Sequence, residues 1–536
     1  MAKALLIGLD GATFTTLEPL MDSGAMPFLR SFARGGVRSI LRSVVPPLTP
    51  PAWTSLTTGK HPGGHGVFDF FQKESPESRT LRFTTSHDVR TSTIWSLASE
   101  QGRTITALNY PLMFPAPKVN GRVVPGGWMP WRQLRLGCHP PGLFDRLKAL
   151  PAFNPRELSH DMALEEKALE GCAEEDHADW ITLHTRRERR WADVLSHLMT
   201  EEPADLTAVL FDGVDKLQHL CWRFLDPALR DESPTPWEAE VSRLCESYFR
   251  QLDEILSALV ERAGSETTVV MASDHGFGPT YDIVYLNTWL EEQGFLAWSG
   301  DQGIRPDANR EVGISQIARH VFELDWERTV AYAATPSSQG IHIARRTSDN
   351  PFGVTDESYP EVRARLVDAL RDFRHPQTGR PVVAEVHTRE QVFPGRFVDY
   401  GPDLTVFLND DAVVSILRSD RVIKRRAHAV GTHRPEGVFL ASGPGLRKGV
   451  EISEISIVDV APLLLHTLEL AVPDDMDGRV PVEAFEPEAL RDRPPLTTTA
   501  TNASLVGSPS SPEETPYDAE DEAIVLKRLA ALGYLE

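Results

Sequence analysis

Three short runs that are continuously or mostly apolar, each followed within two residues by an acidic side chain, constrain the fold of this chain more than any other feature. The runs cover residues 4–9, 205–211 and 267–272. A strand that is apolar along its whole length is typical of a parallel sheet covered on both faces. Helical patterns lie between the runs, for example over residues 180–200 and 241–262. Strands that alternate with helices in this way predict an α/β fold with a mainly parallel sheet.

Carboxylates and histidines follow the ends of these strands. They are Asp10 after the first run, Asp215 and His219 after the second, and Asp274 and His275 after the third. α/β folds place their sites at the carboxyl ends of strands. Since Asp215 and His219 are four residues apart, on a helix they would share one face and could bind one cation.

Two further residues have the chemistry of such a site. Thr49 is a hydroxyl among prolines, expected on a stiff loop before a short helix over residues 52–58. His433 is a lone histidine expected to precede a strand over residues 437–441. With the five strand-end residues this gives seven candidate ligands, about the number that two zinc-like ions in four-coordinate sites need while leaving room for substrate.

The predicted chemistry is phosphoryl transfer to a threonine. A threonine hydroxyl becomes a useful nucleophile when a metal lowers its pKa. Two metals can then hold the alkoxide and a phosphoryl oxygen while charge develops. An in-line attack by Thr49 would give a phosphothreonine, which water would hydrolyse.

Each residue also has a purely structural interpretation. Asp10 fits a turn or a helix cap, Asp215 and His219 fit a solvated pair, and Thr49 fits a rigid loop residue. The joint occurrence, mostly just past strand ends, favours a site.

The order of these motifs resembles the alkaline phosphatase superfamily, specifically its type I phosphodiesterase/nucleotide pyrophosphatase branch. The resemblance spans residues 4 to about 440, and residues 458–479 are similar to the superfamily's closing helix and turn. The combination is highly specific. The matching motifs are LIGLDGA with Asp10, LTPPAWTSLTTGKHPGGHG with Thr49, DKLQH with Asp215 and His219, SDHGF with Asp274 and His275, and GTHRPEG with His433.

The resemblance implies an alkaline-phosphatase-like three-layer sandwich with an inserted cap segment and two divalent metal ions. One metal site would consist of Asp215, His219 and His433. The other would consist of Asp10, Thr49, Asp274 and His275, with Thr49 as the nucleophile. Zinc follows by analogy, and manganese is the alternative because phosphoglycerate mutases of the superfamily use it at corresponding places.

The chain also departs from the nucleotide pyrophosphatases. They typically follow the nucleophile with Phe-Pro-Asn, where this chain has Pro50-Pro51-Ala52. They also have a phosphate-binding Asn after the motif's closing His-Gly, whereas residues 67–70 here read VFDF. Either another donor replaces that amide or the substrate differs. His61 and His65 are interpreted as supports for the loop. Trp53 and Asn109-Tyr110 are candidate pocket residues, with core packing as the favoured role of Trp53.

The same reasoning divides the chain into five parts. Residues 1–280 and 428–487 form the catalytic core, and residues 281–427 form an insertion that partly covers the site. The Thr-, Ser-, Pro- and Glu-rich residues 488–518 are expected to be a flexible linker. Residues 519–536 are expected to form a terminal helix.

Composition limits partners and location. A formal net charge of −22 argues against a nucleic-acid-binding surface, because phosphate backbones need clustered Lys and Arg. No stretch approaches the roughly 18 apolar residues of a membrane helix. The amino-terminal run is too short for a signal-peptide core, so the expected location is cytoplasmic. The partner is then a small-molecule phosphoester substrate, and the oligomeric state and the residues of the substrate pocket stay open.

The sequence therefore predicts a metal-dependent phosphoester hydrolase, and within that class a phosphodiesterase. A phosphomonoesterase or phosphotransferase is the alternative within the superfamily. A non-catalytic binding protein is the alternative from another class, and seven candidate ligands argue against it.

Overall fold

The amino-terminal apolar run forms β1 (Lys3–Leu9), the strand at the centre of the main sheet. Its side chains alternate between two separate cores, with Leu5 and Ile7 in one and Ala4 and Leu6 in the other. Every position after Lys3 is therefore buried, as expected for a strand covered on both faces. The computed structural model describes residues 3–79, 81–126, 133–150, 153–158, 174–299, 323–335, 337, 339–348, 350–409 and 412–499.

Within these residues the main sheet has nine strands and is mostly parallel. β1 pairs in parallel with β7 and β8, and β16 is antiparallel to both of its neighbours. The α/β fold with a mainly parallel sheet is thereby confirmed. The strands, in spatial order, are β17 (Val450–Glu451), β2 (Val37–Arg42), β16 (Glu436–Ser442), β8 (Thr267–Ala272), β1, β7 (Leu206–Phe211), β5 (Ile105–Leu108) and β6 (Gly121–Val124), with β18 (Ile455–Ser456) beside β2.

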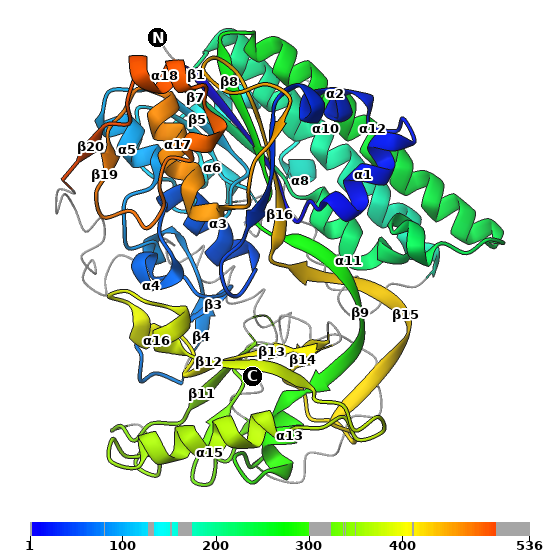
Figure 1. The fold of residues 1–536 in the computed structure, drawn as a ribbon, viewed down its shortest axis with the longest axis vertical. Coiled ribbons are helices and arrows are strands. Elements are labelled where there is room, and N and C mark those ends of the chain that lie inside the picture. The colour runs from blue at the N-terminus through cyan, green and yellow to red at the C-terminus, as the bar shows by residue number, and fades with distance from the viewer. Residues whose placement is uncertain are drawn as a thin grey trace.

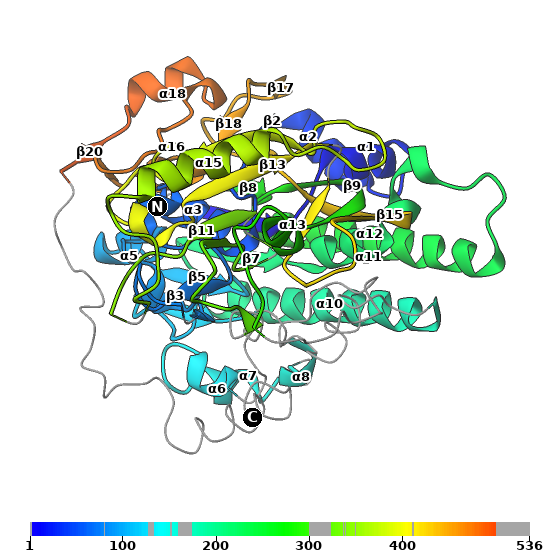
Figure 2. The ribbon, with the colours of Figure 1, turned by 90° about the horizontal axis from the view of Figure 1, so that it is seen from below.

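Helices cover both faces of this sheet and make a three-layer sandwich (Figure 1). α10 and α12 lie side by side in one layer (Figure 2). The helices of that layer are α1 (Phe14–Asp22), α2 (Pro27–Gly35), α10 (His177–Glu201), α11 (Gly213–Leu225) and α12 (Pro236–Ala263). The helices of the other layer are α3 (Thr49–Thr58), α5 (Ile94–Glu100) and α17 (Val460–Thr467).

A long two-stranded ribbon leads from this sandwich to a second unit with its own hydrophobic core (Figure 1). The ribbon consists of β9 (Gly276–Tyr285) and β15 (Ile423–Arg434), which are antiparallel, with His433 opposite Phe277. The second unit comprises β10 (Ala331–Tyr332), β11 (Gly340–Ile343), β12 (Val383–Thr388), β13 (Leu404–Leu408), β14 (Val413–Ser415), α13 (Leu286–Glu292), α15 (Tyr359–Arg371) and α16 (Arg389–Val392).

Shorter elements complete the described chain. The first residues of the expected linker, 488–499, include most of α18 and β20, and residues 500–536, with the expected terminal helix, lie outside the described residues. Among the described residues, no helix is both long and apolar enough to cross a membrane. The shorter elements are α4 (Pro62–His65), α6 (Leu134–Gly137), α7 (Leu143–Leu147), α8 (Pro155–Leu158), α18 (Pro487–Asp492), β3 (Phe71–Lys73), β4 (Leu81–Phe83), β19 (Val472–Pro473) and β20 (Thr497–Thr498).

One local expectation was wrong. Thr49 is the first residue of α3 rather than a loop residue, because Pro50 and Pro51 are compatible with the first turn of a helix. His433 precedes the strand β16, as expected, and is itself part of β15. Residues 121–124 form the edge strand β6, which is not among the strands predicted from the sequence.

Candidate metal centre and nucleophile

The candidate site lies past the carboxyl ends of three neighbouring parallel strands. Asp10 follows β1, Asp212 follows β7, and Ser273 follows β8. After Asp212 the chain forms α11, which carries Asp215 and His219 in its first two turns. The structure brings all seven candidate residues together at this edge.

One group consists of Asp215, His219 and His433. Its ligand atoms all lie within 4.8 Å of one another. Asp215 Oδ1 lies 3.4 Å from His219 Nε2 and 3.3 Å from His433 Nε2. The two histidine Nε2 atoms are 3.0 Å apart. The shared helix face expected for Asp215 and His219 is therefore present, and β15 adds the third side chain.

A second group consists of Asp10, Asp274 and His275. His275 Nε2 lies 3.2 Å from Asp274 Oδ2 and 3.6 Å from Asp10 Oδ1. All three residues are buried. Asp274 Oδ1 accepts a hydrogen bond from the Gly11 amide at 3.1 Å, which links the ends of β8 and β1.

The two groups adjoin each other, and Thr49 lies beside them. The imidazole rings of His275 and His433 stack with their centroids 3.7 Å apart and an angle of 20° between the planes. The Thr49 Oγ1 atom lies 3.5 Å from His275 Nε2. A hydroxyl is thus placed at the junction of two clusters of oxygen and nitrogen donors.

Backbone carbonyls orient two of the histidine rings. His433 Nδ1 donates to the Pro47 carbonyl at 2.9 Å, and His275 Nδ1 donates to the Gly276 carbonyl at 3.1 Å. Since these carbonyls accept, each neutral ring carries its proton on Nδ1 and presents the Nε2 lone pair to the carboxylates. This arrangement is typical of histidines that bind metals.

Burial and crowding shift the pKa values in opposite directions. Burial, with the nearby Asp274 and Asp215 carboxylates, raises the pKa of Asp10 well above its ordinary value. Burial also raises the pKa of Asp274 to about 8. Burial alone would raise the pKa of Asp215, but His219, His433 and Lys216 hold it well below its ordinary value. Burial lowers the pKa of His275, as does the neighbouring His433.

The donor set fits divalent cations. Within the described residues, Asp10 Oδ1, Asp215 Oδ1 and Asp274 Oδ2 are buried and make no hydrogen bond. Buried carboxylate oxygens normally have partners, and here imidazole lone pairs face them instead. A cation between each carboxylate and its imidazole would satisfy both.

α3 holds Thr49 against the sheet. Trp53, one turn after Thr49, is buried over β1, where a Cβ at Gly8 would lie 2.7 Å from its ring. The indole also meets the Tyr110 ring edge-on at 5.4 Å. The interpretation of Trp53 as a core residue is confirmed, and the absence of a side chain at Gly8 allows α3 to approach this closely.

Of the two histidines interpreted as supports for the loop, His65 makes side-chain contacts with the α3–α4 segment and His61 contributes its backbone amide. His65 Nε2 lies 2.9 Å from Ser55 Oγ on α3, and the Val67 amide donates to His65 Nδ1 at 3.1 Å. The His61 amide donates to Asp477 at 2.8 Å. Neither histidine belongs to the two donor groups found among the described residues.

Residues 67–70 face the second unit. The Asp69 carboxylate accepts hydrogen bonds from the hydroxyls of Thr335 and Ser337. The rings of Phe68 and Phe393 meet edge-on at 5.2 Å. This segment therefore joins the sandwich to the second unit.

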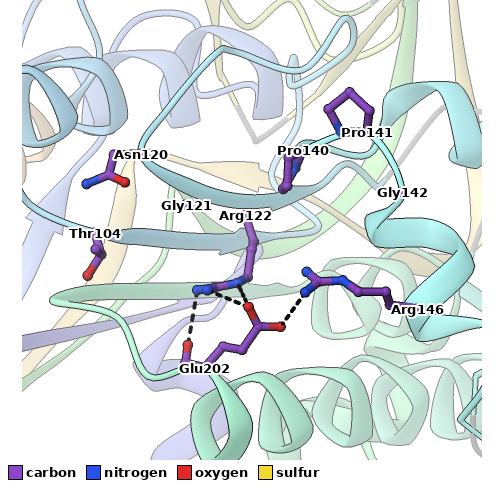
Figure 3. Close-up of a pocket in the computed structure, with 9 residues that line it drawn as sticks. All are labelled: Thr104, Asn120, Gly121, Arg122, Pro140, Pro141, Gly142, Arg146 and Glu202. Atoms are coloured by element: carbon purple, nitrogen blue, oxygen red, sulfur yellow. Dashed lines mark hydrogen bonds and ion pairs between the residues drawn. The ribbon is translucent and has the colours of Figure 1, made fainter.

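A separate hollow of about 540 Å³ lies at the other end of the sheet (Figure 3). Thr104 precedes β5 and Gly121 begins β6, so the hollow opens at the amino ends of these strands. Arg122 and Arg146 both contact Glu202 there, at 2.7 and 3.1 Å. The shared carboxylate already pairs with both guanidinium groups that line the hollow.

Sequence reasoning missed the groups that orient the ligands. The Pro47 carbonyl is a backbone group, and only the proline-rich stretch before Thr49 could have pointed to it. Phe277 packs edge-on against the His219 ring at 4.8 Å. It directly follows the SDHG tetrapeptide, which was the one available signal.

Comparisons with known proteins agree with this geometry. Residues 4–434 match the model of the family described as type I phosphodiesterase/nucleotide pyrophosphatase. No curated protein matches the chain by sequence.

Solved structures show the same fold at low identity. Murine ectonucleotide pyrophosphatase/phosphodiesterase 5, inactive and in complex with AMP, has 14% identity and a TM-score of 0.51, with 92% of this chain and 100% of that chain covered. For the human protein of the same name, the values are 15%, 0.51, 92% and 99%. Phosphonoacetate hydrolase from Sinorhizobium meliloti in complex with phosphonoacetate has 14% identity and a TM-score of 0.50, with 87% and 95% covered.

Proposed function

The chain belongs to the type I phosphodiesterase/nucleotide pyrophosphatase family and is a phosphoester hydrolase, and on this premise we propose that it is a phosphodiesterase that acts through a phosphothreonine on Thr49. The observation that carries the proposal is the position of the Thr49 hydroxyl, 3.5 Å from His275 Nε2 at the junction of two donor clusters.

Thr49 performs the first step. Its Oγ1 attacks phosphorus in line, so that an Oγ1–P bond forms while the bond from phosphorus to the leaving oxygen breaks. The proton that the hydroxyl loses is balanced by the proton that the leaving oxygen takes up. Water then attacks the phosphothreonine and releases Thr49. α3 holds the nucleophile through Trp53, so little rearrangement is needed before attack.

Seven side chains would hold two divalent ions, with zinc as the proposed metal and manganese as the alternative. Asp215, His219 and His433 would form one site. When bound, the two ions supply positive charge that lowers the hydroxyl pKa and stabilises the phosphoryl oxygens in the transition state. The second site would consist of Asp10, Thr49, Asp274 and His275.

The amino end of α3 offers one backbone donor for a phosphoryl oxygen. Pro50 and Pro51 have no N–H, and the Ala52 amide already donates to the Leu48 carbonyl at 2.9 Å. Of this helical turn, the Thr49 amide is the remaining donor, and the helix dipole favours an anion there. We propose that it takes part of the role of the missing Asn.

The substrate class is a small-molecule phosphoester, and the second unit would partly cover it. Contacts of Asp69 and Phe68 with residues of the second unit support a cap made of residues 281–427. Structural neighbours are in complex with AMP and with phosphonoacetate, both small phosphorus-containing anions. A cytoplasmic location stays a prediction.

Thr49→Ala tests the nucleophile. We expect turnover of a bis-aryl phosphate to fall by about 10³-fold or more, because no other hydroxyl replaces the attacking oxygen. Thr57→Ala, two turns further along α3, is the matched control and should keep its activity. Circular dichroism would show that both variants fold. A Thr49→Ala enzyme with unchanged turnover would sink the assignment.

The ester preference needs a separate comparison. Loading the protein with zinc or manganese and measuring bis-aryl against mono-aryl phosphate hydrolysis distinguishes the diesterase from the monoesterase alternative. We expect the higher kcat/KM for the diester with zinc. A higher value for the monoester would favour the phosphomonoesterase.

A further inference from the structure

Among the described residues, Arg187 is the only buried arginine or lysine, with 2% of its surface exposed. It lies on α10, a helix that contributes none of the seven site residues. A buried cation needs partners that repay its loss of water. The partners of Arg187 lie directly behind the site.

The guanidinium group of Arg187 joins three segments of the sandwich. Its Nη1 contacts the Asp212 carboxylate in a buried ion pair. Its Nε donates to the Leu158 carbonyl at 3.0 Å, and its Nη2 donates to Asn109 Oδ1 at 3.3 Å. Asn109 in turn donates to the Leu210 carbonyl on β7 at 2.8 Å.

The next residue of α10, Glu188, contacts Gly213, which follows Asp212 in the chain. Glu188 Oε1 accepts a hydrogen bond from the Gly213 amide at 2.6 Å and from the Tyr248 hydroxyl at 3.1 Å. Gly213 leaves room for this contact, because a Cβ there would lie 2.5 Å from Glu188 Oε1. Arg187 and Glu188 thus both contact residues at the start of α11.

Asp212 and Gly213 are the two residues where β7 passes into α11. The Asp212 side chain makes no capping bond to its own helix, since it faces Arg187 instead. The first turn of α11 is therefore held from α10, and that turn carries Asp215. His219 lies one turn further.

We propose that Arg187 and Glu188 are positioning residues, which hold the start of α11 so that Asp215 and His219 face His433 for metal binding. The inference rests on the proposed metal centre and adds the groups that keep it in shape. Neither residue touches the reacting atoms. Residues that orient metal ligands typically contribute 10- to 100-fold to metal affinity or activity.

Charge supports the same role. Asp212 is buried and lies three residues before Asp215, so an unpaired charge there would add to the negative charge of the site. Arg187 offsets the Asp212 charge in a buried ion pair. The carboxylates of the candidate metal site therefore have no additional unpaired carboxylate at Asp212 next to them.

Zinc titration against a chromophoric chelator tests the proposal. We expect Arg187→Met to weaken one of two zinc sites by about 10- to 100-fold and to leave the other unchanged. Arg187→Lys should restore part of the loss, because a lysine can still pair with Asp212. In a His219→Ala background, adding Arg187→Met should change the affinity for the remaining zinc little.

Two variants guard against a trivial result. Arg187→Met/Asp212→Asn removes both charges of the pair and so avoids an unpaired buried carboxylate, and it should show the same zinc loss. Arg190→Met is the matched control, since Arg190 is on the same helix and pairs with Glu157 at the surface. Its two zinc affinities should equal those of the wild type.

The outcomes separate the two proposals. If Arg187→Met and the double variant bind both zinc ions normally and only unfold more easily, Arg187 is structural and the positioning role is overturned. If the wild-type protein itself binds no zinc, the metal centre fails and the positioning role fails with it.

Discussion

His65 shows how one side chain fixes the helix that carries the nucleophile. The Val67 amide donates to His65 Nδ1, so the ring proton is on Nε2 and points to Ser55 on α3. If Nδ1 were protonated, its N–H would face the N–H of Val67, and two hydrogen-bond donors would lie opposite each other. Burial, with the nearby His61 and Lys60, lowers the pKa of His65 to about 3.

A pH-dependent loss of stability follows from His65. The unfolded chain takes up a proton near the ordinary histidine pKa of about 6.5, whereas the folded protein does so only near 3. The His65 contribution is therefore complete above pH 6.5 and is lost as the pH falls toward 3. Between pH 7.5 and 5 the wild type should lose about 2 kcal/mol more unfolding free energy than His65→Asn.

Urea unfolding of both proteins in chelator, at the two pH values, measures this difference. Chelator removes the contribution of metal binding from the comparison. Equal losses in wild type and variant would show that His65 does not carry this pH dependence.

The approach of α11 to the β9–β15 ribbon sets the distance between the ligands of one metal group. At Gly431 a Cβ would lie 2.2 Å from the Gln218 carbonyl oxygen and 2.9 Å from the Phe277 ring. His219 follows Gln218, and His433 lies two residues after Gly431. Any separation of the two elements therefore moves His433 away from Asp215.

Gly431→Ala should separate these elements. The added methyl has no space, so we expect a loss of about 1–3 kcal/mol in unfolding free energy and weaker zinc binding. Gly35→Ala is the matched control, because no atom lies within 4 Å of its Cβ position. Denaturant unfolding and zinc titration measure both effects. Normal zinc affinity in Gly431→Ala would show that β15 can shift without moving His433.

The elements that could be predicted from sequence are those with a strong local pattern. β1, β7 and β8 are mostly apolar runs, and α10 and α12 have clear helical spacing. The ribbon was not predicted, since β9 and β15 pair across more than 130 intervening residues and their amphipathic pattern is weak.

The candidate ligands could be predicted from the sequence, whereas the contacts that hold them in place could not. Asp10, Asp215 and Asp274 are found from strand ends, and the structure places them together. Arg187 and the Pro47 carbonyl could not be found, because their roles depend on how remote segments pack. The departure at Phe70 was visible, but its meaning required the contacts of Asp69 with the second unit.

At the scale of the whole molecule, the candidate ligands tie together segments that are far apart in the chain. They come from the ends of β1 and β8, from α3, from α11 and from β15. Ions bound by all of these stabilise the folded state only, since the unfolded chain does not assemble the sites.

Zinc removal should therefore destabilise the whole protein. At a free zinc concentration 100 times the Kd, each site should add about 2.7 kcal/mol to the unfolding free energy. Thermal unfolding at several zinc concentrations, and in chelator, would follow this effect. His219→Ala should show a smaller dependence, because one site is impaired. A melting temperature that zinc leaves unchanged would contradict the metal model.

The ribbon also bears on how such a protein can diverge. After His275 the chain leaves the sandwich along β9, and it returns along β15, which contains His433. These two strands are paired side by side. A segment of almost any length can be spliced between two such adjacent ends, because closing a longer loop adds little entropic cost. A related protein could thus acquire a new substrate preference by exchanging the second unit while the candidate metal centre in the sandwich stays intact.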